Sequence, residues 1–144
     1  MSAETNEINA LRFYREVFNN GNLDLVDQLV DPEIVDHNAP PGLPAGIDGY
    51  RQEIVAFRTA FPDIHFIVED LLMEGHTVVV RGTAHGTHQG EFLGIPPTHK
   101  QITMAWIDIL RFAGGKQAEV WHLEDLLGII QQLGGKITPD QVSG

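Results

Sequence analysis

The chain has 144 residues, of which 42% are hydrophobic and 20% charged, as in an ordinary globular domain. A formal net charge of -11 leaves no basic surface for phosphates, so neither nucleic acid nor an anionic membrane is an expected partner. Without cysteine, the chain has no disulfide, thiolate metal site or cysteine nucleophile.

The first half of the sequence has the pattern of helices. Apolar residues at helical spacing from Ile8 to Phe18 predict a long amphipathic helix that ends at residues 19–21. A short second helix is expected at 23–30, an extended piece at 33–37, and a loop rich in proline and glycine at 38–47. A third helix is predicted from Asp48 to Ala60.

The second half has the pattern of strands. They are expected at roughly 64–73, 76–87, 101–112 and 117–125, with a loop at 89–100 and a last helix at 125–133. Helices followed by long antiparallel strands indicate an α+β fold. We expect the sheet to curve into a cone-shaped half barrel with a pocket inside. One domain should span residues 1–144, with a flexible tail at 136–144.

The N-terminal residues lack the basic segment and the apolar run of a signal peptide. No segment approaches the roughly eighteen apolar residues that a membrane-spanning helix needs. These two features predict a cytoplasmic protein.

An aspartate interrupts the apolar row of one predicted strand. Asp108 lies between Trp106 and Leu110 in the two-residue alternation, on the face that a core would occupy. A buried ionised carboxylate costs several kcal/mol unless it is paired (roughly,). His122 on the following strand would supply an imidazole. Asp108 and His122 are therefore candidate catalytic residues in an apolar pocket.

The turn between these two strands decides whether the pair forms. A two-residue loop at Gly114-Gly115 would place Asp108 opposite Trp121, and His122 would point away. A three-residue loop that includes Lys116 would place Asp108 opposite His122. We adopt the three-residue loop.

Five further residues are candidate substrate contacts. They are His37, Phe61, His88, Trp106 and Trp121. Each of the two histidines has an alternative reading, His37 as a surface turn residue and His88 as a support for the loop that follows it. The tryptophans could belong to the core, with one of them lining the pocket. His85 and His88 stand three apart on a strand and so face opposite sides, which argues against a shared metal ion.

Several segments together resemble the SnoaL-like polyketide cyclases, or ester cyclases, of the nuclear transport factor two superfamily. These segments are VDHN at 35–38, FPD at 61–63, RGTAHGTHQGEFLGIPPTHK at 81–100, DILRFAGGKQAEVW at 108–121 and DLLGIIQQLG at 125–134. The resemblance runs from about Leu11 to Gly134. It implies a conical α+β barrel, and it favours the register that pairs Asp108 with His122.

The resemblance also implies a chemistry. In the family an aspartate at the position of His122 is the general acid/base and a histidine at the position of Asp108 lines the pocket, so the two residue types are exchanged here. The implied reaction is an intramolecular aldol closure of a small aromatic polyketide ester, without metal, cofactor or covalent intermediate. With an ordinary pKa of ~6.5, His122 would transfer the proton and Asp108 would orient it. The alternative is that Asp108 is itself the base.

Other functions remain open at this stage. A hydrolase, isomerase or dehydratase could use the same pair, and a non-catalytic binding or dimerisation module could hold it as a buried ion pair. The apolar residues Ile102, Ile107 and Ile109, taken to lie outside the pocket row, predict a homodimer.

Overall fold

The structure of the chain, a computed structural model, describes residues 2–136. All but the first residue of the expected tail at 136–144 therefore lies outside the described residues. The elements in chain order are α1 (Ala3–Arg12), the π-helical η1 (Phe13–Asn19), the 3-10 turn η2 (Leu23–Leu25), α2 (Val26–Leu29), β1 (Val30–Asp36), α3 (Ile47–Ala60), β2 (His65–Glu74), β3 (Thr77–Thr87), β4 (Gln101–Ala113), β5 (Lys116–Glu124) and α4 (Leu126–Gln132).

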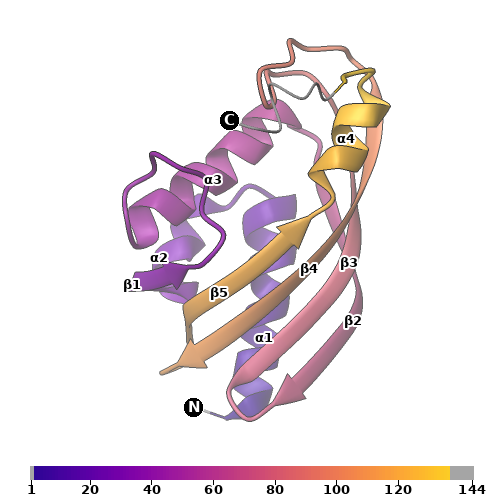
Figure 1. Cartoon of the computed structure of the whole chain (residues 1–144). Coiled ribbons are helices and arrows are strands. Elements are labelled where there is room, and N and C mark those ends of the chain that lie inside the picture. Colours follow the sequence, from indigo (N-terminus) through magenta and orange to yellow (C-terminus); the bar gives the residue numbers. More distant parts are fainter. Residues whose placement is uncertain (1, 137–144) are drawn as a thin grey trace.

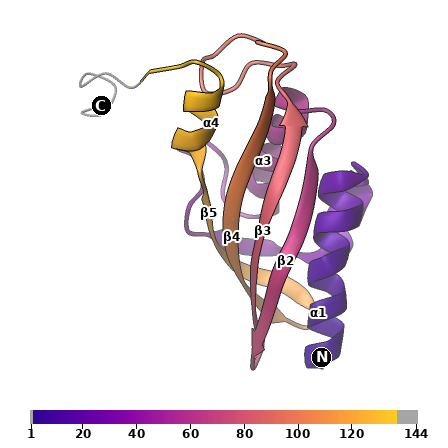
Figure 2. The same ribbon diagram turned by 90° about the vertical axis from the view of Figure 1, so that its right-hand side faces the viewer.

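The strands form one curved sheet in the order β1-β5-β4-β3-β2. β1 runs parallel to β5, and the other neighbours are antiparallel. Figure 1 shows α1 and α3 on the same side of the sheet, which bends around them without closing into a barrel. In Figure 2, α4 and the N-terminus lie at opposite ends of the long strands. The α+β prediction is confirmed. No helix in residues 2–136 is long and apolar enough to cross a membrane.

The two faces of the sheet differ in exposure. Along β4 every second side chain from Ile102 to Phe112 is buried, while those between them are exposed. The buried row belongs to the core, where its Trp106 stacks on Tyr14 of η1. The expectation that Ile102 lies outside this row is wrong. Ile102 and Asp108 both occupy even positions of β4, so their side chains lie on the same face. Ile107 and Ile109 do lie on the exposed outer face.

The β4–β5 turn differs from the prediction, yet the predicted pairing forms. The loop has two residues, Gly114 and Gly115, and both have the positive φ of a tight hairpin turn. A β-bulge then shifts the register between Arg111 and the next pair, and it leaves Ala118 without an opposite residue. This extra residue restores the pairing of Asp108 with His122 that a two-residue turn alone would have lost.

The predicted first helix changes its winding halfway. After α1 the chain continues as η1, whose wider π-helical turns bury Phe13, Tyr14 and Val17. Tyr14 is completely buried and stacks on Trp106, with ring centroids 4.8 Å apart. The π segment thereby directs the Tyr14 hydroxyl at the inner face of β4.

Candidate active site

Asp108 is a buried carboxyl group with one strong hydrogen bond. The Tyr14 hydroxyl donates to Asp108 Oδ2 over 2.6 Å. Burial raises the pKa of Asp108 to about 7, although the Tyr14 hydrogen bond and the positive charge of His122 lower it. Its carboxyl group therefore changes charge near neutral pH, as a general base or acid requires.

His122 is surrounded by carboxyl groups from three elements. Its Nδ1 lies 2.7 Å from Oε1 of Glu124. Its Nε2 lies 2.9 Å from Oδ1 of Asp36 and 3.4 Å from Oε1 of Glu53. The Nε2 atom is buried and makes no hydrogen bond of good geometry, so these two contacts are close but lack aligned N–H directions. The His122 backbone N–H donates to Asn38 Oδ1 over 2.8 Å.

These carboxyl groups determine the charge of the imidazole. Burial alone would lower the pKa of His122, but its contacts with Asp36 and Glu124 raise that pKa to about 11. Burial and the neighbouring Asp36 raise the pKa of Glu53. Burial would raise the pKa of Asp36 too, but contacts with His122 and Glu53 lower it. At neutral pH the cluster therefore holds an imidazolium, an ionised Asp36 and a protonated Glu53.

The ionisation differs from the sequence prediction. The expectation of an ordinary pKa for His122 is wrong, because Asp36 and Glu124 hold its proton. Asp108 does not orient His122 either. Among residues 2–136 the ion-pair partners of His122 are Asp36, Glu53 and Glu124, and Asp108 is held by Tyr14. The two residues face the same cavity as separate groups.

A pocket of about 350 Å³ opens over His122, between the loop after β1, α3 and the loop after β3. We call it the mouth pocket. Its lining residues are Asn38, Pro40, Pro41, Leu43, Gln52, Glu53, Ala56, Phe57, Glu91, Phe92, Leu93, His122, Glu124 and Leu126. A smaller hollow of about 50 Å³ includes Asp108 and shares Glu53, Phe57, His122 and Glu124 with the mouth pocket. A molecule in the mouth pocket would therefore approach both candidate groups.

Two of the expected substrate contacts lie on the outer side of the sheet. The rings of His37 and Trp121 stack with centroids 4.4 Å apart and an angle of 7°. His37 Nε2 lies 2.5 Å from Oε2 of Glu119, which also accepts from Arg111. Neither ring lines the mouth pocket, because odd positions of β5 point away from its inner face.

The other three expected contacts are buried behind the pocket walls. Trp106 is 2% exposed and packs on Tyr14. Phe61 supports the pocket residues Phe57 and Phe92, with centroid distances of 5.6 and 5.1 Å. His88 accepts from the Thr98 backbone N–H at Nδ1 over 3.1 Å, so it fixes the loop, as its alternative reading held. These residues shape the walls without lining the pocket.

Four residues of the cluster were not chosen from the sequence, namely Tyr14, Asp36, Glu53 and Glu124. Glu124 has the same strand parity as His122 and could have been found by alternation. Glu53 interrupts the apolar stripe of α3 between Tyr50 and Phe57, which is also a visible signal. For Asp36, no local pattern indicates that β1 lies beside β5.

The same cluster has the composition of a metal site. Asp36, Glu53 and His122 offer ligand atoms that all lie within 4.8 Å of one another. Imidazole and carboxylate ligands suit several divalent metals. From the sequence, only His85 and His88 came into question as ligands of a shared metal ion. They lie on opposite faces, as expected, with His85 exposed and His88 buried.

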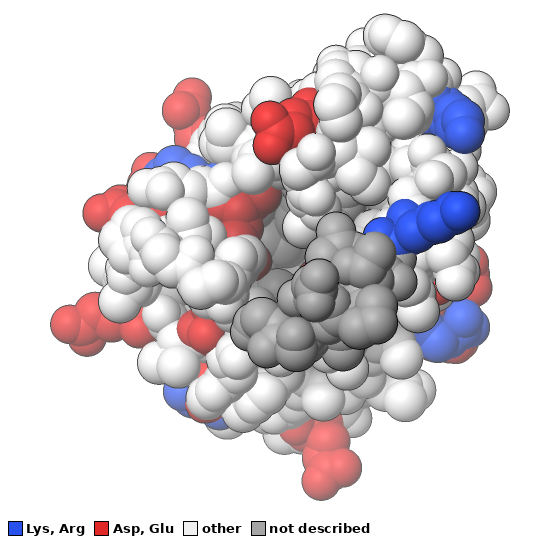
Figure 3. Space-filling model, turned by 45° about the horizontal axis from the view of Figure 1, so that its top comes forward, with Lys and Arg blue, Asp and Glu red and all other residues white. Residues whose placement is uncertain are grey.

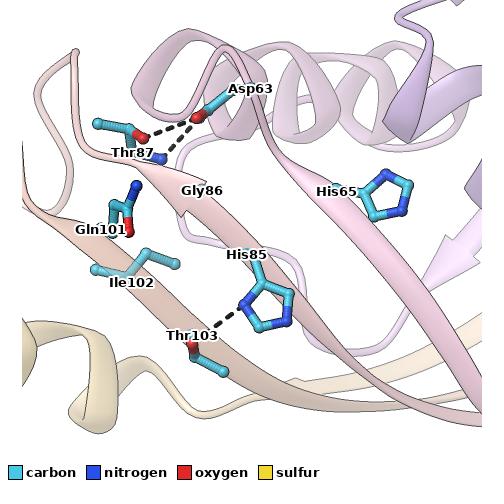
Figure 4. A pocket seen from close by; sticks show the side chains of 8 residues that line it. All are labelled: Asp63, His65, His85, Gly86, Thr87, Gln101, Ile102 and Thr103. Carbon is cyan, nitrogen blue, oxygen red and sulfur yellow. Dashed lines mark hydrogen bonds between the residues drawn. The ribbon is translucent and has the colours of Figure 1, made fainter.

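A second hollow, of about 410 Å³, lies on the outer face of the sheet. Figure 4 shows His65 on β2, His85 on β3 and Thr103 on β4 around it, with Asp63 beside Thr87. Asp63 accepts from the Thr87 backbone and hydroxyl, and Thr103 is hydrogen-bonded to His85. Four of its polar side chains are thus paired with one another, whereas the mouth pocket leads to buried groups with shifted pKa values.

Comparisons with known proteins agree on one family. The family model described as SnoaL-like polyketide cyclase matches residues 8–133. The nogalonic acid methyl ester cyclase of Streptomyces nogalater is 25% identical over 126 residues, which cover 86% of this chain and 94% of that one. The structure of TsrD from Streptomyces laurentii is 29% identical, with a TM-score of 0.86 and coverage of 94% of this chain and 99% of that one. A candidate polyketide cyclase from Bacillus cereus is 36% identical, with a TM-score of 0.79 and coverage of 93% and 85%.

Proposed function

Because the chain belongs to the SnoaL-like polyketide cyclase family, we propose that it catalyses an acid–base reaction of the intramolecular aldol type. The substrate is a small apolar or aromatic molecule in the mouth pocket, and no cofactor is needed. The observation that carries this proposal is the buried Asp108, whose pKa is raised to about 7. A carboxyl group with this pKa exchanges protons efficiently at neutral pH.

We assign the proton transfer to Asp108 and the charge stabilisation to His122. The Asp108 carboxylate removes an acidic C–H proton, and the resulting enolate carbon attacks a carbonyl of the same molecule. One C–C bond forms, and the carbonyl oxygen becomes an alkoxide. Asp108 returns the proton to this alkoxide. The imidazolium of His122 faces the same hollow as Asp108, and its positive charge stabilises the negative oxygen.

The decisive experiment measures proton abstraction separately from ring closure. The protein should accelerate the solvent-deuterium exchange of ethyl benzoylacetate above the enzyme-free rate, as followed by NMR. The rate should rise with pH through about 7, because only the ionised form of Asp108 is a base. Asp108→Asn should lower it by roughly 10²–10⁴.

The control is Asp70→Asn, which removes an exposed carboxylate on the outer face. It should exchange at the wild-type rate. An unchanged rate in a folded Asp108→Asn protein contradicts the proposal. Rates should also be the same with and without EDTA; a loss that Zn²⁺ or Mn²⁺ restores would assign the cluster of Asp36, Glu53 and His122 to a metal instead.

We also propose that the chain forms a homodimer through the outer face of its sheet. Apolar side chains on β4 and β5 are exposed there, and Leu123 is 70% exposed. Ile107 and Ile109 lie beside it on the neighbouring strand, opposite Leu123 and Trp121. A second copy would remove this apolar surface from water.

A further inference from the structure

The lining of the mouth pocket carries an unbalanced charge. Glu53, Glu91 and Glu124 contribute carboxyl groups, His122 contributes one imidazole, and neither lysine nor arginine is present. Figure 3 looks onto this end of the molecule and shows acidic side chains at the edge of a hollow, with the basic ones farther out. The remaining walls are apolar.

The hollows that adjoin the mouth pocket extend this charge. Behind the loop after β1 lies a hollow of about 500 Å³ that includes Glu33, Asp36 and Glu53 and again neither lysine nor arginine. The inner hollow adds Asp108. Apolar walls of low dielectric constant strengthen the field of charges that line a cleft. At the entrance a bound anion would be repelled by the carboxylate of Glu91, whereas deeper in the pocket the imidazolium of His122 offsets the carboxylates beside it.

Glu91 is the least compensated of these groups. Glu124 and Glu53 both contact the imidazole of His122. Glu91 is exposed, and among residues 2–136 it has no ion-pair partner. It therefore retains a charge that a ligand can neutralise.

An exposed apolar residue is presented next to this carboxylate. Leu93 is 55% exposed and has a φ of 50°, a left-handed conformation that is unusual for leucine. The turn is closed by reciprocal backbone hydrogen bonds between Phe92 and Ile95. The rim of the pocket thus offers a carboxylate and apolar side chains within three consecutive residues.

We infer that the ligand of the mouth pocket carries a positively charged amine on an apolar, aromatic body. The amine lies at the rim near Glu91, and the ring packs against the contacting pair Phe57 and Phe92. This inference rests on the proposed function for the choice of pocket. It adds a charge preference, since free carboxylic acids are rejected and uncharged esters bind with intermediate affinity.

Three ligands with the same ring system test this preference by fluorescence or calorimetric titration. They are 2-naphthylmethylamine, methyl 2-naphthoate and 2-naphthoate, which are cationic, neutral and anionic at neutral pH. The amine should bind about tenfold more tightly than the ester, and the ester more tightly than the acid. Raising the salt from about 0.02 M to about 0.5 M should weaken only the amine, because it screens charge attraction.

Glu91→Gln is the test variant and Glu7→Gln the matched control, since Glu7 is an exposed glutamate on α1. Glu91→Gln should reduce the advantage of the amine over the ester to about threefold or less, while leaving ester binding unchanged. Glu7→Gln should leave both affinities unchanged. Equal affinities for amine and ester, tighter binding of the acid, or no binding of any of the three overturns the inference.

The failure of this inference is distinct from a failure of the proposed function. Titration measures affinity alone, whereas deuterium exchange in Asp108→Asn measures proton transfer. Loss of the amine preference with normal exchange removes the charge preference and leaves the acid–base role of Asp108 in place.

Discussion

Two histidine–carboxylate groups are held at β5, on opposite faces of the same strand. On the inner face His122 contacts Asp36, and the two side chains are only 12% and 8% exposed. On the outer face His37 contacts Glu119, and these side chains are 36% and 21% exposed. Both distances are short, at 2.9 and 2.5 Å. Proximity is therefore common to the two groups, and burial distinguishes them.

Burial changes what each group can do. Inside, low solvent access amplifies every interaction, and the pKa of His122 reaches about 11 while that of Asp108 reaches about 7. Outside, Arg111 and His37 lower the pKa of Glu119, which stays an ordinary ionised carboxylate. A surface pair of this kind contributes little to function or stability. We therefore assign the proposed chemistry to the inner group and not to the outer one.

The largest expected effect separates the two histidines. His122→Gln should lower the deuterium-exchange rate by roughly 10²–10³, because it removes the cation that stabilises the enolate. His37→Gln should stay within about twofold of the wild type. Circular dichroism confirms that both variants are folded. Equal losses in the two variants would show that burial does not distinguish them.

A smaller effect is expected from the hydroxyl that holds Asp108. Tyr14→Phe removes the hydrogen bond that lowers the pKa of this carboxyl, so its pKa should rise further. The pH–rate profile should shift to higher pH, with about a tenfold loss at pH 7 that is recovered in more alkaline buffer. A uniform loss at all pH values would mean that Tyr14 serves packing alone.

A stability measurement can test the charge of His122 directly. Its pKa is higher in the folded chain, so its contribution to stability is complete below about 6.5 and is lost as the pH rises toward about 11. The urea midpoint of the wild type should therefore fall between pH 7 and pH 10. This fall should be smaller in His122→Gln and the same as in the wild type in His37→Gln. If the urea midpoints of the wild type and both variants change with pH in parallel, the raised pKa of His122 is contradicted.

The smallest effect on activity is expected from the outer face. Leu123→Lys should convert the homodimer into a monomer in sedimentation experiments at micromolar concentration, because it places a charge on the proposed interface. Exchange activity should change by less than about twofold, since Leu123 points away from the mouth pocket. A wild-type chain that sediments as a clean monomer would reject the dimer.

Local periodicity determined much of this protein. The alternation around Asp108 predicted a carboxylate on the buried face, and the helical spacing of α3 and the strand lengths were readable in the same way. The α+β class followed from the order of these elements. Such patterns are local, and a few neighbouring residues suffice to set them.

Only the tertiary structure decided what surrounds these residues. The Ala118 bulge, which no propensity indicates, set the register of Asp108 against His122. The π-helical winding of η1 brought Tyr14 to Asp108 across 94 positions of sequence. The parallel pairing of β1 with β5 brought Asp36 to His122. An ionisation state depends on every charge and on the solvent around a group, so the shifted pKa values of Asp108 and His122 could emerge only once distant segments had met.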